Sequence, residues 1–159
     1  MRFAFESPVP APRERVFDFF EAPGNLATLM RGWPGFRMVS ATERIREGLV
    51  VRVRVRFGPV WVPLAFEHGR HRPPESMQER LIEGPFSRLD HLHEFVEKGG
   101  VTVVRDVLDM RLPAWLGGEI AMHALVAPFV RRVFAFRRER LRELPWVESL
   151  EETKSCMQS

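Results

Sequence analysis

The sequence predicts an α+β fold, with a curved antiparallel sheet of about six or seven strands wrapped around one long C-terminal helix. Apolar and polar residues alternate with a period of two through most of residues 36–112, which is typical of half-buried strands. Glycine and proline interrupt this alternation at short intervals, as tight turns between neighbouring strands require. The period becomes helical from about residue 114 to residue 144, which predicts the long helix.

A short alternating strand opens the chain, and the prolines between residues 8 and 12 are expected to end it. Two short helices should follow this strand. Pro12 suits the first turn of a helix that continues to about Glu21 and carries an apolar side rich in phenylalanine. Asn25 can cap a second helix, which the glycines and proline between residues 32 and 35 end.

Four strands are predicted next, over residues 36–42, 49–57, 60–68 and 76–82. The second of them alternates most clearly, because its valines face one side of the sheet and Arg52, Arg54 and Arg56 face the other. These arginines most simply form the solvated outer face of the sheet, and an anionic partner is the alternative.

The turn at Gly58–Pro59 sets the pairing between the second and third of these strands. It places Phe66 on the inner face and Trp61 opposite Arg56 on the outer face. A cation–π contact between the last two would contribute about 0.5–1 kcal/mol. Because Pro63 has no backbone donor, we expect the third strand to lie at a sheet edge or to be bulged there.

Residues 84–113 predict one hairpin with a polar cluster on its inner face. Odd positions face inward in the first strand and even positions in the second, which places His91, His93 and Asp106 among apolar neighbours. A turn of two or four residues keeps this parity, whereas a three-residue turn would put the histidines and the aspartate on opposite faces.

The outer face of the same hairpin suggests its register. A turn around Lys98 and Gly99 sets Arg88 opposite Asp109, which is a favourable charge pair. The same register places His91 opposite Asp106, with His93 as a diagonal neighbour. We therefore expect His91 to be the direct cross-strand partner of the aspartate.

The C-terminal helix carries a wide apolar arc, so it must be covered over much of its circumference. Pro128 is expected to bend it and to remove one backbone hydrogen bond. Core packing explains most of the arc, and a homodimer interface is the alternative for its surplus. Residues 145–159 are polar and acidic, which predicts a single domain over residues 1–144 followed by a disordered tail.

Composition narrows the function classes. The chain has 159 residues, of which 45 % are hydrophobic and 28 % charged, as expected of one globular domain. A charged N-terminus and the lack of a long apolar run predict a cytoplasmic protein without stable membrane association. The net charge is +3, but the arginines are spread over several elements, so no nucleic-acid partner is expected. Cys156 is the only cysteine, which excludes a disulfide within one chain.

The concave face of such a sheet lines the space between sheet and helix. Phenylalanine, valine, leucine and methionine dominate the inward positions, so this space should be apolar, with His91, His93 and Asp106 as polar exceptions. Three roles are open for the trio: a structural hydrogen-bond cluster, the polar end of a ligand cavity, or an acid–base group that abstracts a proton beside a carbonyl.

A metal site is a further alternative for the same residues. A His-x-His pair on one strand face suits zinc, with Asp106 or His68 as a third ligand. The second histidine pair of a strong zinc motif is missing, so we expect no metal ion and no other cofactor. Gly-x-Ser-x-Gly, phosphate-loop and dinucleotide patterns are missing too, which leaves nucleophilic hydrolysis and nucleotide chemistry without support.

Several short motifs together resemble a known family. They are Asn25-Leu26 with Trp33 and Phe36, Gly84-Pro85-Phe86, His91-Leu92-His93-Glu94-Phe95, Thr102, Asp106, Pro113 and Phe136-Arg137. Over roughly residues 1–144 they resemble the bacterial polyketide cyclase/dehydrase-like, ligand-binding branch of the START and birch-pollen-allergen (helix-grip) superfamily. The resemblance implies a hydrophobic cavity between the sheet and the last helix. Some members bind lipids, sterols, quinones or plant hormones, and others are aromatases or cyclases.

We therefore expect the protein to bind a small hydrophobic molecule, lipid-, quinone- or polyketide-like, with His91, His93 and Asp106 as polar anchors. The expected wall residues are Phe66, Leu89, Phe95, Val104 and Leu108. Trp33 lies between glycine and proline and is expected in a loop that forms a lid over the cavity, and a core anchor is the alternative role. A cyclase or dehydratase that uses the polar trio is the alternative, and an interaction module that uses the arginines and the last helix is the third hypothesis.

Overall fold

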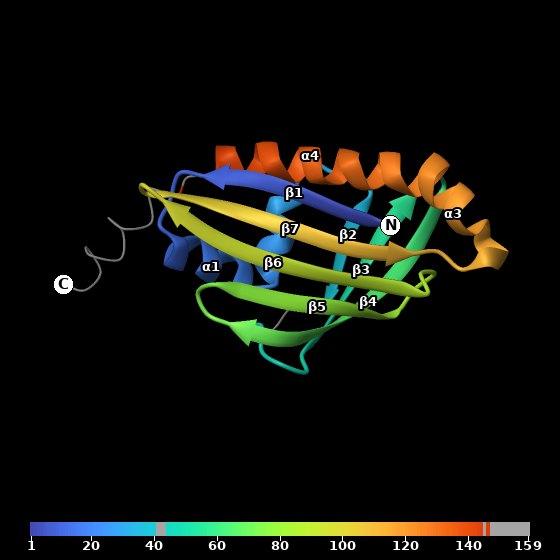
Figure 1. Ribbon diagram of the computed structural model, residues 1–159, viewed down its shortest axis with the longest axis horizontal. Coiled ribbons are helices and arrows are strands. Elements are labelled where there is room, and N and C mark those ends of the chain that lie inside the picture. Colours follow the sequence, from blue (N-terminus) through green and yellow to red (C-terminus); the bar gives the residue numbers. More distant parts are fainter. Residues whose placement is uncertain (41–43, 145, 147–159) are drawn as a thin grey trace.

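Figure 1 shows the computed structural model, which describes residues 1–40, 44–144 and 146. Within these residues seven strands form one antiparallel sheet in the order β1-β7-β6-β5-β4-β3-β2. The strands are β1 (Arg2–Val9), β2 (Phe36–Ser40), β3 (Val50–Phe57), β4 (Val60–Arg72), β5 (Ser76–Glu83), β6 (Arg88–Lys98) and β7 (Val101–Arg111). The sheet curls around the C-terminal helix α4 (Ala127–Glu143), which confirms the predicted α+β plan.

Strand β1 is longer than predicted, because it continues through Pro8 to Val9. Pro8 pairs with Val103 of β7, and β1 lies at the edge of the sheet. An edge strand tolerates a proline because the missing backbone donor is not needed by a second neighbour. The strand ends at Val9, just before Pro10, as the predicted effect of the prolines between residues 8 and 12 requires, although Pro8 itself is part of it.

Two short helices follow β1, as predicted. They are α1 (Arg13–Glu21) and α2 (Gly24–Leu29). Asn25 does not cap α2, because it lies inside the helix and its side-chain amide donates to the carbonyl oxygen of Phe19 at 2.9 Å. The residue instead ties the second helix to the end of the first.

The β3–β4 pairing has the predicted register, with Trp61 opposite Arg56. The cation over the Trp61 ring is instead Arg37 of β2, 4.5 Å from the ring centroid, so the predicted partner was wrong. The long Arg37 side chain spans the intervening strand. Pro63 lies in a part of β4 that pairs only with β3, since pairing with β5 begins at Ala65. The strand is internal to the sheet but has a local edge at the proline.

The β6–β7 register differs from the predicted one by two residues. Gly99 and Gly100 form a two-residue turn with φ of +59° and +79°, the backbone that favours glycine in tight hairpins. This turn places His93, and not His91, opposite Asp106. An even shift preserves the faces, so both histidines and the aspartate still point inward.

The outer charges of this hairpin meet in spite of the shifted register. Arg88 lies opposite Arg111, which corrects the predicted pairing with Asp109. Its guanidinium still reaches Asp109 diagonally at 3.2 Å and Asp90 on its own strand at 2.7 Å. Exposed pairs of this kind contribute about 0–1 kcal/mol each, so they do not fix the register on their own.

The predicted C-terminal helix is divided into segments. A 3-10 turn (Ala114–Leu116), α3 (Gly118–Ala121) and a π-helical turn (Met122–Val126) precede α4, and Pro128 lies in the first turn of α4. The wider π turn accommodates the proline, whose ring and missing donor would break a regular helix interior. Within the described part of the chain, no helix is long and apolar enough to span a bilayer.

The packed body extends beyond residue 144. Trp146 is buried, its indole nitrogen donates to the carbonyl oxygen of Leu141 at 2.6 Å, and its ring lies 5.2 Å from that of Phe19. The other residues of the predicted tail, 145 and 147–159, lie outside the described residues. Trp146 therefore belongs to the core near α1.

Candidate functional site

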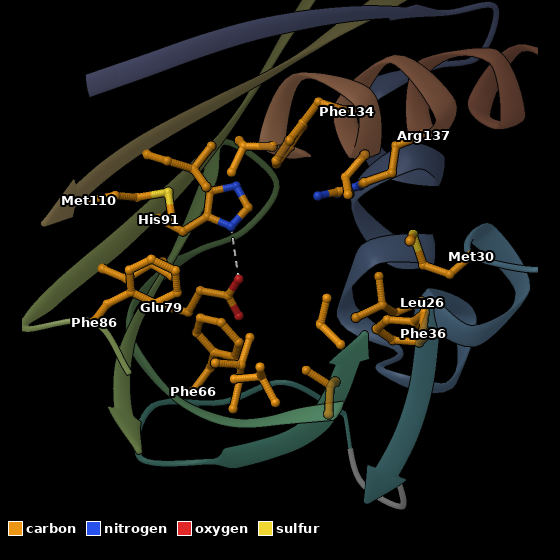
Figure 2. Close-up of a pocket in the computed structure, with 18 of the residues that line it drawn as sticks. Leu26, Met30, Phe36, Phe66, Glu79, Phe86, His91, Met110, Phe134 and Arg137 are labelled. Carbon is orange, nitrogen blue, oxygen red and sulfur yellow. Dashed lines mark hydrogen bonds and ion pairs between the residues drawn. The ribbon is translucent and has the colours of Figure 1, made fainter. Parts of the chain in front are cut away.

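A cavity of about 450 Å³ lies between the concave face of the sheet and the C-terminal helical segments (Figure 2). This volume suits a small organic ligand. Its ionisable lining residues, among those the structure describes, are His68, Glu79, His91, His93 and Arg137. All the other described lining residues are apolar or glycine.

Most of the predicted pocket residues line this cavity. The structure brings together Trp33, Phe66, Leu89, His91, His93 and Leu108 along its wall. Asp106 lies one layer deeper, behind the histidines, and is 1 % exposed. It acts on the cavity only through the side chains in front of it.

Phe95 and Val104 were predicted as wall residues but lie outside the cavity lining. Both belong to a solid core cluster beneath α1. The Phe95 ring meets those of Phe17 and Phe20 of α1, with centroid separations of 5.1 Å and 5.2 Å. The inner face of the hairpin is longer than the cavity, and α1 fills the space at this end.

Trp33 lies in the loop between α2 and β2 and is partly buried. Its ring contacts two rings of α4, Phe136 at 5.3 Å and Phe129 at 6.2 Å between centroids. The loop position and the contacts with the helix agree with the expected place of a lid, and the lid function itself stays a prediction.

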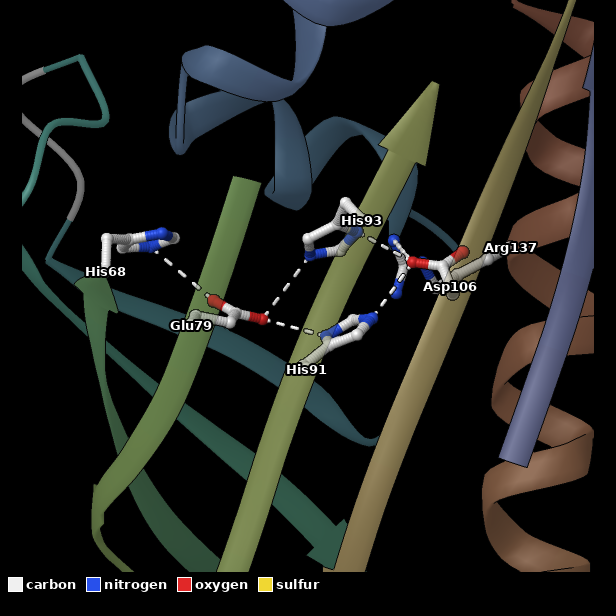
Figure 3. A network of polar contacts seen from close by, with 6 residues as sticks. All are labelled: His68, Glu79, His91, His93, Asp106 and Arg137. Carbon is white, nitrogen blue, oxygen red and sulfur yellow. Dashed lines mark hydrogen bonds and ion pairs between the residues drawn. The ribbon is translucent and has the colours of Figure 1, made fainter. Parts of the chain in front are cut away.

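The two histidines form the centre of the polar network in Figure 3. His91 lies between two carboxylates, with Nδ1 2.9 Å from Glu79 Oε1 and Nε2 3.0 Å from Asp106 Oδ1. His93 Nδ1 lies 2.7 Å from the same Asp106 oxygen, as an ion pair rather than a directed hydrogen bond, and its Nε2 lies 3.6 Å from Glu79 Oε1. The two imidazole rings are 3.9 Å apart.

Two more side chains extend the network at its ends. Arg137 of α4 lies 3.7 Å from Asp106, and His68 of β4 lies 3.5 Å from Glu79. The Arg137 Nε and His68 Nδ1 atoms are buried without a hydrogen-bond partner among the described residues. Both side chains line the cavity, so both can take part in binding a molecule there.

The network keeps both carboxylates ionised. Burial alone would raise the pKa of Glu79, but the hydrogen bonds and charges of His91 and His93 hold it well below its usual range. Burial opposes ionisation of Asp106 in the same way, and Arg137 and the two histidines hold its pKa well below the usual value. Two negative charges are therefore present in the interior at neutral pH.

Positive charge balances the two buried carboxylates. Burial alone would lower the pKa of His93, but its contacts with Asp106 and Glu79 raise it to about 9. The pKa of His68 is lowered, chiefly by burial, so this ring is neutral. With His93 protonated, the positive charges of Arg137 and His93 offset the negative charges of Glu79 and Asp106.

Glu79 and Arg137 are the site residues that the sequence analysis missed. Glu79 alternates with Met77 and Leu81 on β5, which is a signal that it faces inward. Arg137 lies three residues after Phe134 and four before Leu141 on one helical face, and its two apolar neighbours are buried. Both signals are weak because charged residues surround each position.

Comparison with known proteins identifies the family of the chain. A family model described as polyketide cyclase / dehydrase and lipid transport matches residues 9–136. The chain belongs to this family. Membership confirms the resemblance to the START and birch-pollen-allergen superfamily and supports hydrophobic-ligand binding in general. A search of curated proteins finds no relative of the chain.

Solved structures share the fold of this polyketide cyclase / dehydrase family member. The protein TTHA0849 from Thermus thermophilus is 21% identical, with a TM-score of 0.64 over 89% of this chain and 97% of that one. CV1439 from Chromobacterium violaceum is 13% identical, with a TM-score of 0.70 over 92% and 98%. The major latex-like protein 151 from Panax ginseng is 12% identical, with a TM-score of 0.64 over 89% and 93%. At these identities the likeness shows the fold alone.

Proposed function

We propose that the protein binds a small hydrophobic molecule, lipid-, quinone- or polyketide-like, in the cavity between the sheet and the C-terminal helix. The observation that carries this proposal is the composition of the cavity wall, in which the ionisable side chains all belong to one contact network and the rest is apolar. Such a wall favours a ligand with a large apolar part and one polar group.

The polar group of the ligand should be a hydrogen-bond-accepting oxygen, such as that of a carbonyl or hydroxyl. Arg137 lines the cavity and points into it in Figure 2. A hydrogen bond to a charged group contributes about 1.5–3 kcal/mol, so a ligand oxygen that accepts from this guanidinium gains affinity. The predicted anchors His91 and His93 line the same part of the cavity wall.

Native mass spectrometry of the purified protein, followed by extraction, tests whether a hydrophobic molecule is retained. A fluorescent fatty acid provides a second, defined probe. We expect Leu108→Trp, which fills the cavity from β7, to weaken probe binding at least about 10-fold. Val96→Trp is the matched control, because this residue of the same hairpin is 44% exposed.

Equal probe affinity in both variants, with circular dichroism that shows both are folded, would place the probe outside the cavity. An empty wild-type protein that also fails to bind the probe would contradict the proposal. Retention of a lipid, a quinone or a polyketide would support it and identify the ligand class.

Catalysis of the cyclase or dehydratase type is the second candidate function. The observation that favours it is the pair of imidazoles in contact with ionised carboxylates at the cavity wall, an arrangement that can move a proton beside a carbonyl group. A β-hydroxy ketone probe that dehydrates only with protein would show turnover. His91→Ala should then reduce the rate with little change in probe binding, whereas a binding protein has no rate to lose.

A further inference from the structure

Three side chains at the cavity wall bring possible metal-ligand atoms close together. Glu79 Oε1, His91 Nδ1 and His93 Nε2 all lie within 4.8 Å of one another. The carboxylate oxygen is 2.9 Å from the His91 nitrogen and 3.6 Å from the His93 nitrogen. Atoms that share one ion at roughly 2.0–2.2 Å are roughly 3–3.5 Å apart, so these separations need little adjustment. We propose that Glu79, His91 and His93 bind a divalent transition-metal ion such as Zn²⁺ or Fe²⁺.

The opposite nitrogens of both rings are already in contact with a carboxylate. Asp106 Oδ1 lies 3.0 Å from His91 Nε2 and 2.7 Å from His93 Nδ1. Histidines that bind metals usually place their other ring nitrogen against such a carboxylate, which orients the ring and increases its basicity. Arg137, 3.7 Å from Asp106, holds this carboxylate from behind. The three ligands are therefore supported by two further side chains.

The tautomers that this arrangement favours call for a cation at the proposed site. A neutral imidazole carries one N–H, and when that group faces Asp106 the other nitrogen presents a lone pair. The lone pairs of His91 and His93 then converge on the Glu79 carboxylate, three electron-rich atoms in a buried place. Positive charge at its centre stabilises such a cluster. A proton on His93 supplies that charge in the metal-free protein, and a metal ion that displaces the proton would supply it in its place.

The three ligands also indicate which ions the site would bind and whether it would have open coordination positions. Two imidazoles and one carboxylate suit zinc and non-haem iron and leave coordination positions open. All three ligands line the cavity, so the open positions face its interior. His68, whose Nε2 is 3.5 Å from the second Glu79 oxygen, lies close enough to contribute a fourth protein ligand after a small shift. An oxygen of a bound molecule would complete the coordination.

Metal binding can be measured without any organic ligand. We expect the full chain, stripped with EDTA and titrated calorimetrically with Zn²⁺ alone, to bind one ion. Glu79→Gln and His93→Ala should each weaken binding by about 100-fold or more, beyond the loss typical of outer-shell changes. His123→Ala is the matched control, because His123 is an exposed histidine of the π turn outside the cluster, and it should retain wild-type affinity.

Cobalt gives a readout that does not depend on variants. Co²⁺ bound by this triad should give visible absorption bands of the protein-bound ion that Zn²⁺ abolishes. No uptake by wild-type protein, or equal loss of affinity in the cluster variants and in His123→Ala, would overturn the metal site and leave a proton in its place. Fluorescent fatty acid binding in EDTA tests the proposed cavity function separately, so the failure of one does not imply the failure of the other.

Discussion

The two ends of the β6–β7 hairpin differ in what covers them, although their inner faces follow the same alternation. Near the turn, Phe95 and Val104 are 2 % and 0 % exposed and belong to a solid cluster under α1. Farther along the same strands, Leu89 and Leu108 line the cavity. The covering element there is the divided C-terminal helix, whose π turn lies at the cavity wall.

This difference shows that an apolar inner face does not by itself decide between a packed core and a ligand cavity. The short helix α1 brings its rings into contact with the sheet, whereas α4 runs along β1 at one side of the curled sheet (Figure 1). The polar network lies between the two regions and contacts both. Substitutions at matched positions should therefore separate stability from binding.

The largest expected effect is on the packed end. Phe95→Ala should reduce the free energy of unfolding by about 3–5 kcal/mol, because the ring is enclosed by α1 and leaves a closed cavity. Phe66→Ala, the same change at the ligand cavity, should cost less stability because it enlarges an existing space. Urea unfolding of the two variants measures this difference.

The same two variants should show the opposite order when ligand affinity is measured. Phe66→Ala removes a wall residue, so affinity for the fluorescent fatty acid should fall, and Phe95→Ala should leave that affinity unchanged in the folded fraction. Similar losses of stability in both variants would show that the cavity collapses around the deleted ring and that the two ends are equivalent.

The sequence predicted which side chains of this hairpin face inward, but not which residues pair across its strands or which helix packs against each end. Side-chain parity survives a register error of two residues, so His91, His93 and Asp106 were correctly placed inward. Which histidine pairs directly with Asp106 depends on which residues form the turn. The positive φ angles of Gly99 and Gly100 identify these two residues as the turn, and the sequence alone does not give those angles. The fate of Phe95 depended on how α1 docks, which is a long-range contact that alternation does not encode.

The next largest effect should come from the polar network between the two ends. Asp106→Ala should destabilise the protein by about 3–5 kcal/mol, because it leaves buried Arg137 without its carboxylate partner and removes one of the two that His93 contacts. Asp109→Ala on the outer face of the same strand is the control and should change stability by about 1 kcal/mol or less. Equal effects at the two positions would mean that the inner network is solvated.

The change of stability with pH should be slightly smaller than the effect of Asp106→Ala. In the metal-free protein, with EDTA present, the pKa of His93 is about 9 in the folded state and 6.5 when unfolded. The folded state then binds more protons between these values, so stability is fully present below pH 6.5 and falls by about 3 kcal/mol as the pH rises through 9. His93→Gln should flatten this part of the curve.

On the acid side the sign is opposite. The pKa values of Glu79 and Asp106 are lowered in the folded state, so their contribution is present above the ordinary carboxylate range and is lost as the pH falls through their folded values. Thermal unfolding followed from pH 4 to pH 10 should therefore show a maximum at mildly acidic pH. A stability that is constant between pH 6.5 and pH 9 would contradict the charge balance proposed for His93.

Arg137 illustrates why part of the site was beyond sequence analysis. Arginines are frequent along α4, and only the phase of the helix decides which of them faces inward. The π turn at Met122–Val126 shifts that phase relative to the preceding segment, and a uniform helical period over residues 114–144 does not anticipate the shift. Glu79 was missed for a related reason, because charged side chains occur on both faces of β5.

The smallest expected effect concerns the exchange of ligand at the cavity. Trp33→Ala should lower the free energy of unfolding by about 1 kcal/mol, since the ring is only partly buried. If the contacts of Trp33 with Phe129 and Phe136 close the cavity, the variant should also release the fluorescent fatty acid roughly 10-fold faster. Trp115→Ala is the control, because this tryptophan is 80% exposed. If stopped-flow measurements give an unchanged dissociation rate for Trp33→Ala, or the same rate for both variants, Trp33 is a packing residue. The difference between the two hairpin ends would then depend on α1 and the π turn alone.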